Sequence, residues 1–193
     1  MLKKYRRVVT GHDKSGRSVV ISDDVSPGGL ASPDRPNQGR TSIWMIDRST
    51  ASNREVDLID LETEPPGFPP AGSGGSSFMI MELPPESELD AMPPDQRERA
   101  MVPVVDVLPE AIDVGGNKFY GMHATDTVDL LLIVSGEVSV MVDEGEVTLR
   151  PGDTMIQRGG NHGWINRGSE PAIVAAFVVD AEPLDRSARL NAS

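Results

Sequence analysis

The pattern that most constrains the fold lies between residues 118 and 180. There, short runs of Val, Leu, Ile and Met are separated by turn-forming segments such as SGE, DEG, RPGD and NRGSEP. Turn signals recur about every 8 to 12 residues, which is the spacing of an antiparallel sandwich or barrel. The sequence therefore predicts an all-β domain over this region.

The rest of the chain predicts extensions of one domain rather than a second one. The length of 193 residues suits a single core, and 19 Gly, 16 Pro and 4% aromatic residues predict many turns and few long helices. We expect N-terminal strands and loops, with a hairpin, over residues 1–60, a Pro/Gly-rich linker over 61–77, a barrel over 78–180 and a tail over 181–193. The N-terminal strands are expected to extend the barrel or to pair with a partner subunit.

Segment 84–117 is longer than a connection between two sheet strands requires. Loops beyond about 12 to 15 residues are commonly functional, so we predict a lid over the mouth of the barrel. One short helix is expected over residues 94–101, because Pro94 suits the first helical turn.

The charge and the missing cysteines exclude several classes of function. A formal net charge of −12 repels nucleic acid and anionic membrane surfaces, so a small molecule is the expected partner. The chain has no cysteine, which excludes thiolate catalysis and thiolate metal sites and favours a cytoplasmic location. No apolar run approaches the roughly 20 residues of a membrane-spanning helix, and no signal-peptide pattern opens the sequence.

Polar and apolar residues share one face of a predicted strand early in the β region. In the stretch GMHATDTVDLLLIVSG, His123, Thr125, Thr127 and Asp129 occupy alternate positions ahead of Leu131. Side chains alternate faces along a strand, so these residues point to the same side. They line a pocket if that side is the interior of a barrel and decorate a surface if it is not.

The chain has 3 histidines, so few side chains are available as neutral-pH bases. His12 lies in a polar turn and is expected to be solvated. His162 lies in QRGGNHGWIN, with the strand parity of Trp164. Candidate chemistry is therefore concentrated at His123 and His162.

The two histidine segments resemble the two motifs of the cupin superfamily. The first motif aligns His123, Thr125, Asp129 and Gly136, and the second aligns Pro151-Gly152-Asp153, Gly159, His162 and Asn166. The resemblance implies an all-β, jelly-roll-like cupin double-stranded β-helix barrel, with an N-terminal hairpin and one or two short helices around it. In such barrels the first-motif residues point inward and leave room for one small ligand.

The resemblance also implies a reduced metal site. Cupins hold a divalent ion with three His and one Glu, whereas here Thr125 stands at the second His and Asp129 at the Glu. His123, Asp129 and His162 would then hold iron, manganese, nickel or zinc, in the two-His-one-carboxylate set that suits Fe(II). A metal-free pocket remains open, in which His123 or His162 acts as general acid or base and Asp129 orients it.

Further candidate substrate-binding residues surround this site. Besides Thr125 and Thr127, Gln157 and Arg158 are placed to meet a carboxylate, since Arg binds such groups through two parallel hydrogen bonds. Trp164 stacks on a planar substrate or fills the barrel, and Tyr120 lies near the rim.

The resemblance implies a small-molecule enzyme that acts on an organic acid, an aromatic or a polyketide-like metabolite. Decarboxylase, dehydratase or isomerase, and oxygenase chemistry all suit such a pocket, so the activity is a lyase, an isomerase or an oxidoreductase. The alternative is a non-catalytic binding or sensing protein with a decayed metal site, which the missing second His favours. Cupins commonly pair, so a homodimer is implied as well.

Overall fold

The computed structural model of the chain describes residues 1–26, 29–51 and 67–186. Within these ranges the strands are β1 (Arg6–His12), β2 (Ser18–Val25), β3 (Leu30–Ala31), β4 (Gly39–Ile46), β5 (Ser76–Leu83), β6 (Thr127–Ser135), β7 (Val138–Val142), β8 (Gly145–Leu149), β9 (Thr154–Arg158), β10 (His162–Ile165) and β11 (Ala172–Asp180). The helical segments are the 3-10 helix η1 (Glu86–Ala91) and the α-helices α1 (Pro94–Ala100) and α2 (Val104–Val107).

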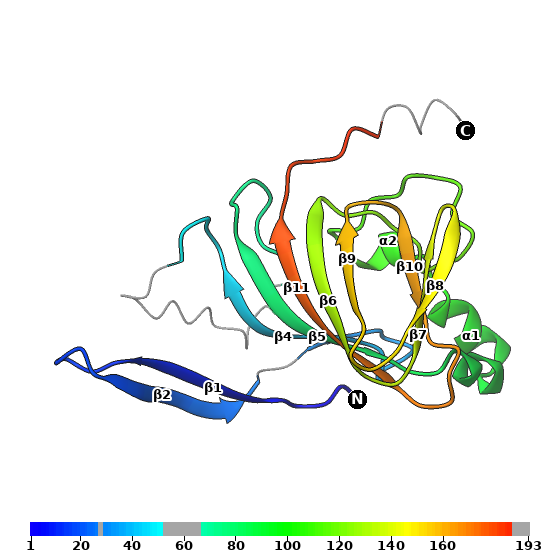
Figure 1. The fold of residues 1–193 in the computed structure, drawn as a ribbon. Helices are drawn as coiled ribbons and strands as arrows, with labels where there is room; N and C mark the ends of the chain where they lie inside the picture. Colours follow the sequence, from blue (N-terminus) through cyan, green and yellow to red (C-terminus); the bar gives the residue numbers. More distant parts are fainter. Residues whose placement is uncertain (27–28, 52–66, 187–193) are drawn as a thin grey trace.

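Two curved sheets form the barrel in Figure 1. The larger one has the strand order β3-β4-β5-β11-β6-β9, and the smaller one has the order β10-β7-β8. All their pairings are antiparallel. This architecture confirms the predicted fold class, with a few short helices beside a double-stranded β-helix.

The core lies between the two sheets, and apolar residues from β5, β6, β7, β8 and β11 build it. Its buried members are Met79, Leu131, Ile133, Val138, Val140, Leu149, Ala172, Val174, Ala176 and Val178. Along β6, residues at odd positions are buried up to Ile133, whereas Leu130, Leu132 and Val134 are exposed. The face that carries Thr127 and Asp129 is therefore the inside of the barrel.

The N-terminal residues form the expected hairpin and two strands of the larger sheet, β3 and β4. Strands β1 and β2 pair with each other and extend to one side of the barrel (Figure 1). Strand β4 pairs with β5, so the N-terminal part lengthens the sheet within its own chain. Strand β5 begins at Ser76, inside the predicted linker. Residues 61–66 of that linker and 187–193 of the predicted tail lie outside the described residues.

The predicted lid segment contains η1, α1 and α2, and backbone hydrogen bonds tie it to the strand ends near the motifs. Glu86 N–H donates to the Asn166 carbonyl at 2.7 Å, and Val104 N–H donates to the Tyr120 carbonyl at 3.0 Å. Helix α1 begins at Pro94, as expected. The role of the segment as a lid stays a prediction.

Candidate functional site

The two motif histidines meet inside the barrel. His123 and His162 form an isolated antiparallel bridge, with N···O distances of 2.8 and 2.9 Å in the two directions. Their ring centroids are 4.6 Å apart, and the rings are tilted by 42°. Exposed fractions of 9% for His123 and 2% for His162 place both side chains in the interior.

Backbone carbonyls fix the tautomer of both rings. His123 Nδ1 lies 3.1 Å from the Gly121 carbonyl oxygen, and His162 Nδ1 lies 2.9 Å from that of Gly160. A carbonyl oxygen only accepts, so Nδ1 carries the hydrogen in each ring. The Nε2 lone pair of each neutral imidazole is therefore left to accept a proton or to bind a ligand.

Burial keeps both imidazoles neutral. Desolvation lowers the pKa of His123, against a smaller opposing effect of the Gly121 hydrogen bond. Desolvation, followed by repulsion from a charged His123, lowers the pKa of His162 to about 4. At neutral pH the pair is thus a set of two uncharged bases.

Asp129 is a third buried titratable side chain inside the barrel, beside the two histidines in the motifs. It lies on β6 opposite Gln157 of β9 and Val178 of β11, and its exposed fraction is 8%. Burial raises its pKa to about 6, although a hydrogen bond from Thr127 acts in the opposite direction. Within the described chain its buried Oδ1 has no hydrogen-bond partner. A carboxyl in this state exchanges protons close to neutral pH.

The predicted substrate residues separate into inward and outward groups. Thr125 and Thr127 are buried, with hydroxyl oxygens 2.8 Å apart. Gln157 is buried too, and its Nε2 donates to the Gly160 carbonyl that also accepts from His162. Arg158 is exposed, because it alternates with Gln157 along β9. The structure therefore places Arg158 away from the histidines.

A metal site needs its ligands around one point, and the structure shows how the candidate ligands lie. Among the residues it describes, no group of three or more His, Asp or Glu side chains is arranged to hold a metal ion. The two Nε2 atoms and the unpartnered Asp129 oxygen are donors of the right kind. They do not converge into a three-ligand shell, so metal binding stays a prediction and no chemical step below depends on it.

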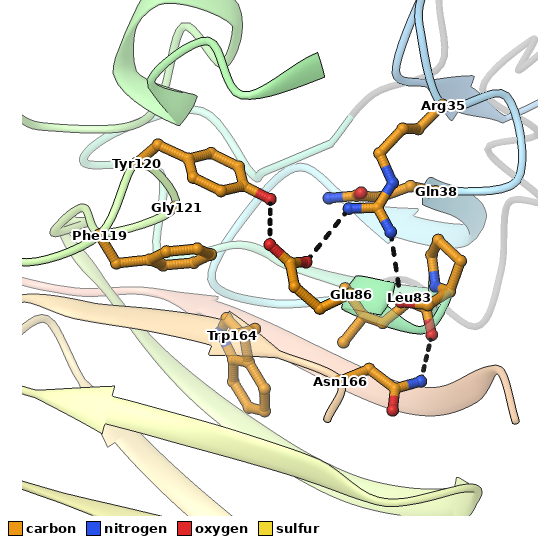
Figure 2. A pocket seen from close by; sticks show the side chains of 10 residues that line it. Arg35, Gln38, Leu83, Glu86, Phe119, Tyr120, Gly121, Trp164 and Asn166 are labelled. Carbon is orange, nitrogen blue, oxygen red and sulfur yellow. Dashed lines mark hydrogen bonds and ion pairs between the residues drawn. The ribbon is translucent and has the colours of Figure 1, made fainter. Parts of the chain in front are cut away.

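A cavity of about 30 Å³ lies among the residues drawn in Figure 2. Tyr120 and Trp164, two of the predicted substrate residues, line it. The ring of Trp164 stands edge-on to that of His162, with centroids 6.2 Å apart. Gly121, whose carbonyl orients His123, belongs to the same wall. The cavity and the histidines are thus neighbouring parts of one end of the barrel.

Sequence reasoning missed the residues on the other side of this cavity, which are Arg35, Gln38 and Glu86. Arg35 and Gln38 lie in the Pro-rich turn between β3 and β4, and Glu86 follows a Pro pair at the start of η1. Charged residues in such segments are normally solvated. A local signal for their burial is absent from the sequence.

Arg186 joins the two loops that carry the histidines. Its guanidinium donates to Asp126 Oδ1 at 2.7 Å and to the carbonyls of Thr125 and Gly159 at 3.0 Å each. Gly159 has a φ of +63°, and a Cβ there would lie 2.9 Å from the Thr125 carbonyl oxygen. The loop before β10 can therefore approach the start of β6 closely only with glycine at this position.

The sheet order, the inward His pair and the acidic β6 residue define a cupin barrel, and comparisons with known proteins agree. Residues 111–179 match the family described as "Cupin domain". The chain is 30% identical over 194 residues to "Phomopsin biosynthesis cluster protein C'" of Diaporthe leptostromiformis, which covers 98% of this chain and 85% of that protein. The chain belongs to the cupin superfamily.

Three more known proteins are similar to this chain, two in sequence and one in structure. "Phomopsin biosynthesis cluster protein D" of the same fungus is 28% identical over 195 residues, covering 98% of this chain and 85% of that protein. "Cupin-domain-containing oxidoreductase virC" of Hypocrea virens is 30% identical over 77 residues, or 38% of this chain and 40% of that one. The solved Schizosaccharomyces pombe Cnp3 cupin domain has a TM-score of 0.46 and 11% identity, covering 97% of this chain and 95% of that one.

Among the described residues, no helix has both the length and the apolar character needed to cross a membrane.

Proposed function

We propose that this cupin is a small-molecule enzyme that moves protons next to a carbonyl group, as isomerases, dehydratases and decarboxylases do. The observation that carries the proposal is the combination of two buried, neutral histidines with free Nε2 atoms and a buried carboxyl whose pKa is raised to about 6. A general acid or base works best when its pKa lies near the operating pH, and burial moves the pKa of the Asp129 carboxyl toward neutral pH while it keeps both imidazoles uncharged.

In this proposal His123 is the base, because it is the more exposed of the two rings. Its Nε2 accepts a proton from the carbon beside the carbonyl, and the C–H electron pair moves onto the carbonyl oxygen as an enolate. The protonated form of the Asp129 carboxyl donates its proton to the enolate oxygen, which gives the enol and leaves Asp129 as a carboxylate. His123 then returns its proton to carbon while the enol O–H proton goes back to Asp129, and burial favours this step because it disfavours the charged imidazolium.

The relatives support a role in metabolite chemistry. The names of the Diaporthe leptostromiformis relatives refer to a biosynthesis cluster, and virC of Hypocrea virens is called an oxidoreductase. We extend this to an organic acid, aromatic or polyketide-like substrate with an enolisable carbon. Redox chemistry with a divalent metal at His123, Asp129 and His162 remains the competing form of the proposal.

The test follows hydrogen–deuterium exchange, which requires only the first proton transfer. Protein is mixed in D₂O with pyruvate, phenylpyruvate, acetoacetate and a cyclic β-diketone, and loss of the α-proton signals is followed by NMR. We expect exchange faster than in buffer, unaffected by chelator, and abolished in His123→Asn. Asn retains a donor for the Gly121 carbonyl but has no basic nitrogen. Exchange only after addition of Fe(II), Mn(II), Ni(II) or Zn(II) would replace acid–base catalysis with metal chemistry.

A second candidate is a metabolite-binding protein without turnover. The observation in its favour is that the predicted ligand residues do not converge on one point within the described chain. His123→Asn then shifts ligand affinity only, whereas in the enzyme it also removes the exchange activity.

We also propose a homodimer in the cytoplasm. The hairpin exposes Val8, Val20 and Ile21, and the outer face of the larger sheet exposes Leu132 and Phe177. Exposed apolar side chains gathered on one sheet face are typical of protein contacts. Light scattering on the eluting protein should give twice the chain mass of 20.7 kDa, and a monomer would refute the pairing. The absence of cysteine supports the location, which cell fractionation tests.

A further inference from the structure

The cavity beside the histidines contains a buried cation. Arg35 is only 1% exposed. One guanidinium nitrogen, Nη2, donates to the carbonyls of Pro85 at 3.0 Å and Pro84 at 3.5 Å, and Nη1 lies 3.3 Å from Glu86 Oε2. Figure 2 shows the guanidinium in contact with the Glu86 carboxylate. Such a group is costly to bury, so its position is fixed by these partners.

The polar groups of this cavity have no net charge between them. Tyr120 donates its hydroxyl hydrogen to Glu86 Oε1 at 3.0 Å, and Glu86 is also the ion-pair partner of Arg35. Burial, followed by the nearby Glu86 carboxylate, raises the pKa of the Tyr120 phenol, which therefore remains protonated. A charged ligand would be buried here without a free counter-charge, so a neutral ligand fits better.

Two polar atoms of the cavity residues have no partner in the described chain. They are Nε of Arg35, which is a donor, and Oε1 of Gln38, which is an acceptor. A buried polar group without a partner is unfavourable, and a ligand that pairs both atoms would remove that penalty. The matching group has a carbonyl oxygen for Arg35 and an N–H for Gln38, as a carboxamide does.

The dimensions and walls of the cavity suit the end of a molecule. A cavity of about 30 Å³ accommodates roughly two waters, hence a group of a few atoms rather than a whole metabolite. Phe119 and Trp164 line it and offer aromatic surface to whatever carries that group.

We propose that the cavity between Arg35, Gln38 and Trp164 binds the carboxamide end of a neutral, planar ligand. The carbonyl oxygen accepts from Arg35 Nε–H, and the amide N–H donates to Gln38 Oε1. Glu86 and Tyr120 hold the guanidinium in place. This binding site goes beyond the proposed function, because occupying it requires no proton transfer by the histidines.

The test is a titration of the full, ¹⁵N-labelled protein with benzamide, followed by NMR. The chain has 2 Trp, so Trp164→Phe assigns the indole N–H signal of Trp164. We expect a saturable shift of that signal and of the Arg35 Nε–H signal. Benzoate, which is charged, and N,N-dimethylbenzamide, which has no N–H, should bind at least about tenfold more weakly, the loss expected for one unmade hydrogen bond to a buried group.

Variants identify the groups responsible. Gln38→Leu removes the acceptor and should weaken benzamide binding about tenfold, without affecting the weak binding of N,N-dimethylbenzamide. Arg35→Lys keeps the charge but has no Nε–H, so it should also weaken benzamide binding. If Arg35→Lys does not fold, the measurement on Gln38→Leu is sufficient by itself. His123→Asn, which removes the proposed base, should bind benzamide as the unaltered protein does, so failure of the proposed catalysis leaves this result intact. Equal affinity for benzoate and benzamide, or no saturable shift, would overturn the proposal.

Discussion

The histidine pair and the Arg35 cavity lie side by side, yet they keep polar groups buried in different ways. Burial lowers the pKa of both histidines and raises that of Asp129, so in each case the uncharged form is favoured. Arg35 and Glu86 remain charged and compensate each other. The comparison indicates that the first region should respond to pH and the second to loss of a partner.

The largest expected effect comes from breaking the compensation in the cavity. Glu86→Gln leaves the Arg35 guanidinium buried without its counter-charge, so unfolding in urea should show a loss of about 3 kcal/mol in stability. Glu137→Gln is the matched control, because the ion pair of Glu137 with Arg150 is exposed and is worth about 0–1 kcal/mol. Equal losses of stability in Glu86→Gln and Glu137→Gln would contradict the distinction between a buried and an exposed ion pair.

Acid should destabilise the barrel through His162. Its pKa is lowered from 6.5 to about 4 in the fold, so its neutral form is favoured above pH 6.5 and stability falls as the pH drops from 6.5 to 4. Urea titrations give the free energy of unfolding of the unaltered protein and of His162→Asn. The difference between the two should shrink by roughly 2–3 kcal/mol as the pH falls across this window. A difference that is constant with pH would show that His162 titrates normally.

Asp129 should act with the opposite sign. Its pKa is raised from 3.8 to about 6, so the folded state binds the proton more tightly and loses stability as the pH rises from 3.8 to 6. Asp129→Asn removes this loss and should stabilise the protein by about 2 kcal/mol at pH 8, with little change at pH 3.5. Asp106→Asn, at an exposed position, provides the control and should have no such pH dependence.

The smallest effect is expected at the contact that holds the histidine loops. Arg186→Gln removes the half-buried ion pair with Asp126 and should cost about 1 kcal/mol of stability. Amide hydrogen exchange at His123 and His162 should accelerate, because their loops lose a shared anchor. Arg158→Gln, on the exposed side of β9, should change neither the stability nor the exchange rates. Faster exchange at His123 and His162 in Arg158→Gln would show that Arg158 has a role the structure does not display.

The histidine site could be anticipated because its geometry follows from strand alternation. The order His123, Thr125, Thr127, Asp129 fixes a common face, and β6 has that face inside. The same rule separates Gln157 from Arg158, the two candidates for binding a carboxylate. They are consecutive, so only Gln157 is buried, and Arg158 points outward.

The Arg35 cavity could not be anticipated in this way. Tyr120 and Trp164 were expected near a pocket from their positions beside the motifs, but their partners lie far away in the chain. Glu86 is 51 residues from Arg35 and 34 from Tyr120. Pro-rich segments that contain charged residues are typical of solvated turns. A local sequence pattern does not indicate that such a turn is buried by other parts of the chain.

Some features of this cupin therefore follow from the local sequence, and others follow only from the tertiary structure. Alternation along strands, turn glycines such as Gly136 and Gly159, and the spacing of the motifs are local properties, so the amino-acid order alone specifies the barrel and its inward histidines. Burial of Arg35 against Glu86 depends on β4 pairing with β5 and on η1 packing against Asn166. Such contacts arise from closure of the whole barrel, because burial is set by everything that surrounds a residue and not by its neighbours in sequence.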